Sequence, residues 1–362
     1  MTGQHRIVVL GAGYAGLAAA RRFARKAPDA TITVVDARTH FVERVRLHQR
    51  FAGQQTRSWS LRELLEPKGI HVVHGQVSEI DAGSSLVRFD GREPLAYDTL
   101  VYTLGSIADD AGVPGVAEHA YSVATPESAA RVPAKGPIVV VGAGSTGIEV
   151  AAELAESRSG TRVELISTEE PGAWLSPRAQ VHIRRVLERL GVRIHTEAKV
   201  IEVTADAVRL ADGTSIDSAA TVWTAGFAVP QLAARAGLAV DAHGRMRTDA
   251  TLRSLSHPNV YAAGDSAVVA GPGDRELRMA CATALPTGAY AADVISARLR
   301  GRGPGELKFR YHFQCLSMGR HDGVIQFLHA DDTPGRMVLT GRTAARFKEG
   351  IVRFAAAGAG AK

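Results

Sequence analysis

The sequence predicts an α/β protein built around two copies of one strand–turn–helix unit. One copy reads IVVLGAGYAGLAAA at residues 7–20, and the other reads IVVVGAGSTGIEVA at residues 138–151. In both, a β-branched apolar run leads directly into G-A-G-x-x-G and then into a helical pattern, which is the context that this glycine motif needs. The repeat therefore predicts two Rossmann-like dinucleotide-binding domains with parallel sheets.

Length and composition set the limits of the interpretation. The chain has 362 residues, of which 45% are hydrophobic and 22% charged, as in globular proteins of two or three domains. Its formal net charge is +6, but the basic residues are spread along the chain and no nucleic-acid-binding motif occurs, so we expect no nucleic-acid partner. The two cysteines, Cys281 and Cys315, fit neither a disulfide framework nor a zinc site, and we expect no metal.

Each glycine of the motif has its own physical role. The first permits the tight turn from strand to helix, the second lets the backbone approach a pyrophosphate, and the third lets the helix pack closely on the strand. The N-terminus of the helix then offers free N–H groups and a positive dipole end to the phosphates. The residues concerned are Gly11, Gly13, Tyr14, Ala15 and Gly16 in the first copy and Gly142, Gly144, Ser145, Thr146 and Gly147 in the second.

The residue that ends the next strand differs between the two copies. In the first copy it is Asp36, twenty residues after Gly16, which is the spacing expected for a carboxylate on a ribose hydroxyl. In the second copy it is Ser167, which does not decide between NADH and NADPH. Glu169 or Glu170 is an alternative source of the carboxylate, so the nucleotide preference stays open.

The remaining pattern predicts strands that end near the ligands and a C-terminal segment of strands and a helix. TLGS at 103–106 and TAGF at 224–227 end corresponding strands in the two halves, and AAGD at 262–265 ends a further strand. A helix is predicted at 176–190 and another at 278–299, broken near Pro286. Further strands are predicted at 69–77, 85–89, 99–103, 192–195, 207–210, 308–311, 324–327 and 337–340, and a last helix at 341–357.

These motifs, in this order, resemble the two-dinucleotide-binding-domain flavoproteins of the pyridine nucleotide-disulfide oxidoreductase superfamily. The resemblance rests on GAGYAG with Asp36, TLGS, GAGSTG with Glu149, TAGF, and AAGD with Asp265. It implies a discontinuous FAD-binding domain with an NAD(P)H-binding domain inserted in it, followed by a short α+β segment. The implied boundaries are 1–115 and 245–305 for the FAD domain, 116–244 for the NAD(P)H domain, and 306–362 for the C-terminal segment with its terminal helix.

The resemblance also assigns cofactor contacts to individual residues. Glu149 matches a position whose carboxylate lies near the nicotinamide, and the helix N-terminus near Leu285 and Pro286 would face the reduced flavin. The implied FAD contacts are Gly11, Gly13, Tyr14, Ala15, Gly16, Asp36, Ala37, Arg38, Val77, Leu104, Gly105, Gly264, Asp265, Leu285 and Pro286. The implied NAD(P)H contacts are Gly142, Gly144, Ser145, Thr146, Gly147, Glu149, Ser167 and Gly226.

Within the superfamily, the chain resembles the type II NADH dehydrogenase and apoptosis-inducing-factor-related branch. Residues 37–65 contain no cysteine, which argues against a disulfide reductase, and FVERVRLHQ at 41–49 is similar to that branch. The resemblance implies hydride transfer from NAD(P)H to FAD and then two electrons to a quinone. It places Glu43 and His48 near the flavin, either as a proton relay or as packing or surface groups. A glutamine that the branch carries at its quinone pocket is absent from residues 280–293.

Three other functions stay open at this point. One is an NAD(P)H-dependent reductase of a small electron-carrier protein of the ferredoxin or rubredoxin type, for which the basic net charge is suitable. Another is a flavin-dependent tailoring oxidoreductase that acts on a small natural product. The third is not an enzyme but a flavin-binding redox sensor.

The C-terminal helix bears on the location of the protein. No apolar run reaches the roughly 18 residues of a membrane span, and the N-terminus lacks a signal-peptide pattern, so we expect a cytoplasmic protein. The predicted helix 341–357 is basic and amphipathic, so it either lies on an anionic membrane surface or packs on the body or a partner subunit. The family resemblance also allows a homodimer. The basic stripe comprises Arg342, Arg346 and Arg353, and the apolar stripe comprises Phe347, Ile351 and Phe354.

Overall fold

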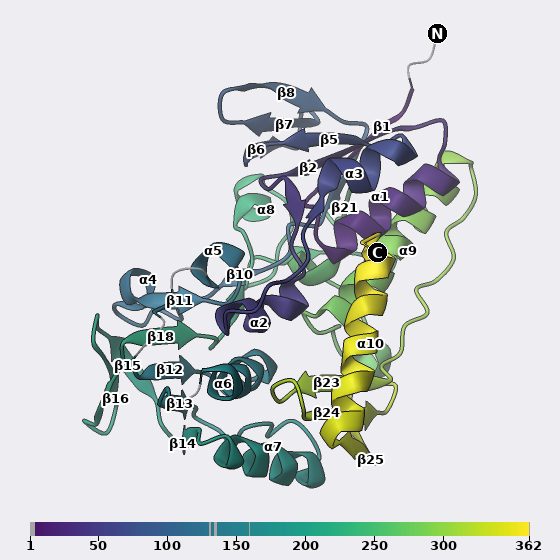
Figure 1. Cartoon of the computed structure of the whole chain (residues 1–362). Coiled ribbons are helices and arrows are strands. Elements are labelled where there is room, and N and C mark those ends of the chain that lie inside the picture. The colour runs from purple at the N-terminus through teal and green to yellow at the C-terminus, as the bar shows by residue number, and fades with distance from the viewer. Residues whose placement is uncertain (1–3, 130–131, 134–135, 159, 362) are drawn as a thin grey trace.

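Two five-stranded parallel sheets dominate the fold (Figure 1), which confirms the predicted α/β class with two Rossmann-like units. The computed structural model describes residues 4–129, 132–133, 136–158 and 160–361. The first sheet has the strand order β21-β9-β1-β2-β5: Val260–Ala262, Thr99–Tyr102, Arg6–Leu10, Thr31–Asp36 and His71–His74. The second has the order β11-β18-β12-β13-β14: Ala120–Ser122, Ala220–Trp223, Ile138–Val141, Val163–Ile166 and Arg193–His195.

The two glycine motifs occupy the same topological position. Strand β1 lies between β2 and β9 and leads into α1 (Tyr14–Lys26), while β12 lies between β13 and β18 and leads into α6 (Ser145–Ser157). In both sheets the motif therefore follows the strand at which the strand order reverses. Ligands of open parallel sheets bind in the crevice at this point.

Two helices pack very closely beside the first sheet. α9 (Cys281–Leu299) lies against α1, and a Cβ on Gly288 would overlap the backbone carbonyl of Ala15. Glycine at this position is what allows the two helix backbones to approach. The core under these helices also includes Leu232, Ala233 and Leu238, which follow the last strand of the second sheet.

The smaller sheets and helices attach to these two units. Strand β10 (Ile107–Ala108), directly after TLGS, pairs antiparallel with β19 (Phe227–Ala228), which begins at the last residue of TAGF, so these two segments join the two units directly. The remaining strands are β3 (His40–Phe41), β4 (Trp59–Ser60), β6 (Val77–Asp81), β7 (Leu86–Phe89), β8 (Arg92–Ala96), β15 (Val200–Val203), β16 (Ala207–Leu210), β17 (Ser215–Asp217), β20 (Met246–Arg247) and β22 (Ala267–Val268). The remaining short helices are η1 (Arg44–Arg46), α2 (Leu47–Phe51), α3 (Leu61–Leu65), η2 (Glu66–Lys68), α4 (Val116–His119), α5 (Pro126–Ala129), α8 (Leu232–Arg235), η3 (Gly264–Ser266) and η4 (Pro272–Asp274), and the longer α7 spans Pro177–Arg189.

The C-terminal segment connects the two cores. It forms an antiparallel sheet of β23 (Phe313–Ser317), β24 (Gly323–Leu328) and β25 (Pro334–Thr340), followed by α10 (Gly341–Ala359). Figure 1 shows α10, in yellow, running from this sheet up to α1 and α9. Leu316 on β23 belongs to the core of the second unit, while Ala356 on α10 belongs to the core of the first.

Two details of the sequence prediction are wrong. The helix predicted over 278–299 begins at Cys281 and continues through Pro286 without a break. Pro286 lies in the second turn, and Thr287 Oγ1 adds a hydrogen bond of 2.7 Å to the carbonyl of Thr283, which supports the backbone there. Residues 308–311 form no strand, and the first strand of the C-terminal sheet lies instead at β23.

Candidate functional site

The two glycine motifs fold with the same backbone geometry. A Cβ on Gly16 would overlap the carbonyl of Gly11, and a Cβ on Gly147 would overlap the carbonyl of Gly142. Gly11 and Gly142 have φ values of +95° and +99°, which strongly favour glycine. The close strand–helix packing expected from the sequence is therefore present in both units.

A threonine closes each motif from the neighbouring strand end. Thr103 Oγ1 donates to the carbonyl of Gly11 at 3.0 Å, and Thr224 Oγ1 donates to the carbonyl of Gly142 at 2.9 Å. These are the threonines of TLGS and TAGF, so the corresponding sequences have corresponding roles. The two threonine hydrogen bonds hold the turns between strand and helix, and so fix the position of each helix N-terminus.

The space above each motif suits a dinucleotide pyrophosphate. A Cβ on Gly13 or on Gly144 would meet no heavy atom of the described residues within 4 Å, so both positions face open space. No described side chain caps the first turn of α1 or of α6, which leaves the first N–H groups of each helix free for phosphate oxygens. Both units thus fit the ligand class that the motif predicts.

Asp36 is held rigidly at the end of β2. One carboxylate oxygen accepts a hydrogen bond from the backbone N–H of Ala12 at 2.6 Å, and the other accepts one from the N–H of Arg38 at 2.7 Å. The neighbouring Ala37 carbonyl contacts the His74 ring nitrogen at 3.0 Å. This arrangement fixes the carboxylate beside the first motif, where a ribose would lie.

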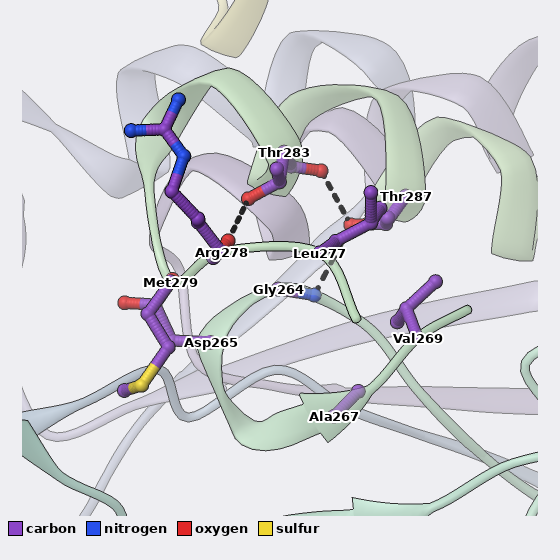
Figure 2. Close-up of a pocket in the computed structure, with 9 residues that line it drawn as sticks. All are labelled: Gly264, Asp265, Ala267, Val269, Leu277, Arg278, Met279, Thr283 and Thr287. Carbon is purple, nitrogen blue, oxygen red and sulfur yellow. Dashed lines mark hydrogen bonds between the residues drawn. The ribbon is translucent and has the colours of Figure 1, made fainter. Parts of the chain in front are cut away.

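The Gly-Asp pair at 264–265 lies across the first motif, beside the start of α9. Asp265 accepts a hydrogen bond of 2.7 Å from Ser106 Oγ, and the Gly264 N–H donates to Thr287 Oγ1 at 3.1 Å. Figure 2 shows the residues that line a small pocket between this turn and α9, with the hydrogen bond from Gly264 to Thr287 at one side of it. The pocket is lined by Gly264, Asp265, Ala267, Val269, Leu277, Arg278, Met279, Thr283 and Thr287.

Two buried hydroxyls beside these motifs lack partners among the described residues. Tyr14 is 7% exposed and directly follows Gly13, and Ser266 is fully buried and directly follows Asp265. Buried polar atoms are normally hydrogen-bonded, and a polar ligand bound in the first unit would give these two hydroxyls a partner. Their positions at both motifs of the first unit fit FAD as that ligand.

Leu285 and Pro286 do not form the helix N-terminus that the sequence analysis expected. The first residue of α9 is Cys281, so both lie in the second turn. A Cβ on Gly358 would lie 3.4 Å from the Leu285 side chain, which places Leu285 against α10. Burial raises the pKa of Cys281 to about 11, so this thiol at the helix start stays protonated.

Glu149 belongs to a buried polar cluster that four elements far apart in the sequence build: α2, α6, β23 and α10. Lys348 on α10 forms an ion pair with one oxygen of Glu149, which also accepts a hydrogen bond from the Ser317 N–H at 2.9 Å. Ser317 Oγ lies 3.1 Å from His48 Nε2, and His48 Nδ1 lies 3.8 Å from the other Glu149 oxygen. We call these four residues, Glu149, Lys348, Ser317 and His48, the proton cluster.

Burial determines the charges in the proton cluster. It is the largest cause that lowers the pKa of Lys348 to about 7, and the positive charge of Arg46 adds to it. Burial also lowers the pKa of His48 well below 6.5, with further lowering from Lys348, so His48 is neutral at neutral pH. Burial and the Arg46 charge thus bring the pKa of Lys348 down to about 7, and the Glu349 carboxylate opposes this shift.

Glu43 lies in a second, connected ion-pair group. Arg46 pairs with Glu43 at 3.4 Å and with Glu349 at 2.7 Å, which ties η1 and the residue before it to α10. Burial raises the pKa of Glu43, and Arg46 opposes this shift. The structure thus separates the two catalytic candidates: His48 joins the proton cluster, whereas Glu43 pairs with Arg46.

The other predicted contacts lie at the edges of the two motifs. Leu104 and Gly105 follow Thr103, and Val77 begins β6. Arg38 pairs with Glu127 at 3.5 Å, and Gly226 lies next to Asp109. At the end of β13, Ser167 Oγ accepts a hydrogen bond of 3.2 Å from the Glu169 N–H.

Sequence reasoning missed Lys348 and Ser317. Lys348 lies on the buried face of α10 in line with Ala344, Val352 and Ala355, so a lysine on an otherwise apolar stripe was the available signal. Ser317 carried no comparable signal, since it ends a strand that the sequence pattern did not predict. No group of three or more described His, Cys, Asp or Glu residues is placed to hold a metal ion.

The fold and the site define a flavoprotein with two dinucleotide sites, and comparisons with known proteins agree. The family model described as pyridine nucleotide-disulphide oxidoreductase matches residues 5–288. A NADH dehydrogenase-like protein of Mycobacterium tuberculosis is 29% identical over 88% of this chain and 87% of its own. A type II NADH:quinone oxidoreductase of the same species is 28% identical over 90% of this chain and 78% of its own length. The solved structure of NDH2 from Plasmodium falciparum with NADH shares the fold, with a TM-score of 0.82 at 14% identity, over 98% of this chain and 96% of that one.

The chain therefore belongs to the pyridine nucleotide-disulphide oxidoreductase family. It is an oxidoreductase enzyme that uses FAD and a pyridine nucleotide, as the sequence predicted. No helix in the described part of the chain combines the length and apolar character that a membrane span requires.

Proposed function

We propose that this protein is an NADH:quinone oxidoreductase. The observation that carries the proposal is the proton cluster, in which a buried lysine with a pKa near 7 contacts the glutamate of the second motif. Reduction of a quinone by a hydride takes up one further proton, whereas reduction of an iron–sulfur carrier protein takes up electrons alone. A buried proton donor beside the site therefore favours a quinone over the carrier-protein alternative. The relatives named as NADH:quinone oxidoreductases support the same acceptor.

Bound FAD would supply the hydride and electron chemistry, so this chain's own residues supply positions and protons. The first motif and Asp36 orient the dinucleotide, and the second motif orients NADH. Lys348 holds a proton at Nζ, and Glu149 holds Lys348 in place through the ion pair. Neutral His48 and Ser317 keep Glu149 oriented, because Ser317 donates to it through its backbone N–H.

The proposed preference for NADH rests on the acidic turn after β13. A 2′-phosphate there would lie near Glu169 and Glu170, and the arginine beside them is already engaged. Arg184 pairs with Glu170 at 2.5 Å and with Glu188 at 3.4 Å. Carboxylates without a free cation disfavour a phosphate dianion.

The test is an anaerobic titration of the purified yellow protein with NADH and, in parallel, with NADPH. We expect NADH to bleach the flavin absorbance at a lower concentration than NADPH does. Reoxidation by a soluble quinone such as menadione should then be fast, while an oxidised ferredoxin should reoxidise the flavin slowly. Fast reoxidation by ferredoxin and slow reoxidation by every quinone tested would refute the assignment.

We further propose that the outer face of α10 contacts a membrane. Phe354 is 75% exposed and Phe347 40% exposed, and Met337 on the adjacent β25 is 66% exposed. Arg342 and Arg346 are exposed on the same helix. Apolar side chains among cations suit the surface of an anionic bilayer, where quinones dissolve.

Vesicle sedimentation tests this contact. The protein should sediment with vesicles that contain phosphatidylglycerol, and a Phe347→Ser/Phe354→Ser variant should stay in the supernatant. Leu255→Ser is the matched control, because Leu255 is 56% exposed but lies outside the C-terminal segment. Equal sedimentation of all three proteins would contradict a role for α10 in membrane contact.

A further inference from the structure

A groove outside the two nucleotide sites lies between α7 and the point where β25 passes into α10. Its volume is about 440 Å³. Figure 1 shows α7 beside β25, close to the start of α10 at the bottom of the view. Most of the groove wall comes from one face of α7, because residues three and four positions apart on a helix share a face. The lining residues are Pro177, Arg178, Val181, His182, Arg185 and Thr340.

The groove carries positive charge that is not neutralised within the described chain. Arg178 and Arg185 are exposed, and neither side chain forms an ion pair or a hydrogen bond with another described residue. His182, which lies between them, has its Nε2 atom 2.8 Å from Oδ1 of Asp322. The Asp322 carboxylate is also engaged by Arg189, at 2.8 Å. The groove therefore presents two free guanidinium groups, which a negatively charged partner would complement.

Exposed apolar side chains lie in the groove and on both sides of it. Val181 is 58% exposed although it lines the groove, and Trp174 is exposed just before α7 begins. On the other side, Met337 is exposed on β25, and Phe347 is exposed on α10, which follows β25 directly. Cations interleaved with tryptophan and other apolar side chains are typical of a surface that contacts an anionic bilayer.

We propose that this groove binds the phosphate headgroup of an anionic phospholipid. The proposal rests on the membrane contact proposed above and names the lipid group that α7 holds. The guanidinium groups of Arg178 and Arg185 supply full charges and planar pairs of N–H donors that match phosphate oxygens. A zwitterionic headgroup carries its own cation beside the phosphate, so it neutralises these two arginines less well than an anionic one does.

The apolar side chains beside the groove favour a lipid over a soluble phosphate compound. A soluble phosphate would pair with the arginines but leave Met337 and Phe347 in water, whereas a lipid brings acyl chains that cover them. A headgroup in the groove would also give the protein a second point of attachment besides α10. Because Lys348 lies on the buried face of α10, attachment through α7 and α10 together fixes how the proton cluster is oriented relative to the bilayer.

The experiment measures binding of the holoprotein to vesicles by sedimentation over a range of lipid concentrations. Arg178→Ala/Arg185→Ala should bind vesicles that contain phosphatidylglycerol about 30-fold more weakly than the wild type, because two arginine–phosphate contacts are lost. Arg247→Ala/Arg302→Ala is the matched control, since it removes the same charge from exposed arginines outside the groove and should bind like the wild type. On vesicles of phosphatidylcholine alone, all three proteins should bind equally weakly.

A second variant tests the groove without removing an arginine. Val181→Glu places a carboxylate in the groove four residues before Arg185, where it would pair with that arginine. It should weaken binding to phosphatidylglycerol vesicles about fivefold or more. Ile201→Glu is its control, because Ile201 is also exposed but lies on β15, outside the groove. All the substituted side chains are exposed, so each variant should melt like the wild type.

Three results would overturn the proposal. The first is wild-type binding by Arg178→Ala/Arg185→Ala. The second is an equal loss in the two double arginine variants, which would reduce the effect to net charge. The third is release of the wild type from vesicles by inorganic phosphate but not by sodium chloride of equal ionic strength, which would assign the groove to a soluble phosphate compound.

Failure of this proposal can be told apart from failure of the functions proposed above. Loss of binding in Arg178→Ala/Arg185→Ala but not in Phe347→Ser/Phe354→Ser would support the groove and count against the apolar contact of α10. The reverse pattern would overturn the groove and leave the α10 contact. Bleaching by NADH and reoxidation by menadione in solution should be unchanged in the arginine variants, so the quinone assignment is tested separately.

Discussion

The two nucleotide-binding units have the same motif but different surroundings. The residue two positions after the last glycine is Ala18 in the first unit and Glu149 in the second. Ala18 is buried in a helix packed against α9, whereas Glu149 meets Lys348 and Ser317 from the C-terminal segment. A local motif thus fixes where a dinucleotide binds, while remote segments decide what chemistry is available beside it.

The largest expected effect comes from adding a methyl group to the third glycine of each motif. Gly16→Ala should prevent FAD uptake, and Gly147→Ala should leave the protein yellow but poorly reduced by NADH, because each Cβ overlaps a backbone carbonyl. Overpacking of this kind costs about 1–3 kcal/mol or more. Absorbance spectra and melting temperatures measure both effects.

Gly13→Ala is the control for these substitutions. Its Cβ meets only open space among the described residues, so the apoprotein should melt like the wild type while FAD affinity falls. Full FAD occupancy in Gly16→Ala would contradict the prediction, because it would show that the first unit accommodates a Cβ beside the carbonyl of Gly11.

The second prediction removes the feature that distinguishes the second unit. Lys348→Met should lower the rate of quinone reduction about 100-fold or more, as expected for the loss of a proton donor. Bleaching of the flavin by NADH should persist, because hydride transfer needs no protein acid. Stopped-flow absorbance separates the two half-reactions. Arg346→Met on the exposed side of the same helix is the control and should retain both steps. Equal loss of both steps would assign Lys348 a purely structural role.

The third prediction is a pH profile that depends on Lys348. Its pKa is lowered to about 7, so the protonated donor is present below pH 7 and is lost as the pH rises through 7. Quinone reduction should fall over this range in the wild type, and Lys348→Met should show no such fall.

The free energy of unfolding should change with pH in the opposite direction to the rate of quinone reduction. Between pH 7 and 10.5 the unfolded chain binds the proton that the folded chain has released, so raising the pH favours the folded chain. The wild type should therefore gain stability over this window relative to Lys348→Met, as measured by chemical denaturation. A wild-type profile that is flat across pH 7 in both measurements would contradict the lowered pKa.

The contrast between local motifs and remote segments also explains which features could be predicted from the sequence. Both motifs, Asp36 and the strand ends at TLGS and TAGF are local signals, so the fold class and both cofactors could be predicted. The proton cluster could not, because His48, Glu149, Ser317 and Lys348 are far apart in the sequence and meet only when α10 docks. Pro286 misled the prediction because proline is tolerated in an early helix turn when neighbouring side chains support the backbone. The link of Glu43 to Arg46 rather than to His48 also depends on α10, since Glu349 holds Arg46.

The smallest expected effect comes from making the second unit resemble the first at the end of its strand. In the first unit, Asp36 accepts hydrogen bonds from the N–H groups of Ala12 and Arg38 and is thereby held for a ribose. Ser167 occupies the corresponding place and accepts from the Glu169 N–H alone among the described donors. Ser167→Asp should therefore raise the preference for NADH over NADPH, measured as the ratio of kcat/KM values, by about fivefold, the value of roughly one net hydrogen bond. Ser167→Ala, the control, should leave the ratio near that of the wild type. An unchanged ratio in Ser167→Asp would mean that the turn after β13 holds the ribose differently from the turn after β2, and that the two units diverge in cofactor binding as well as in chemistry.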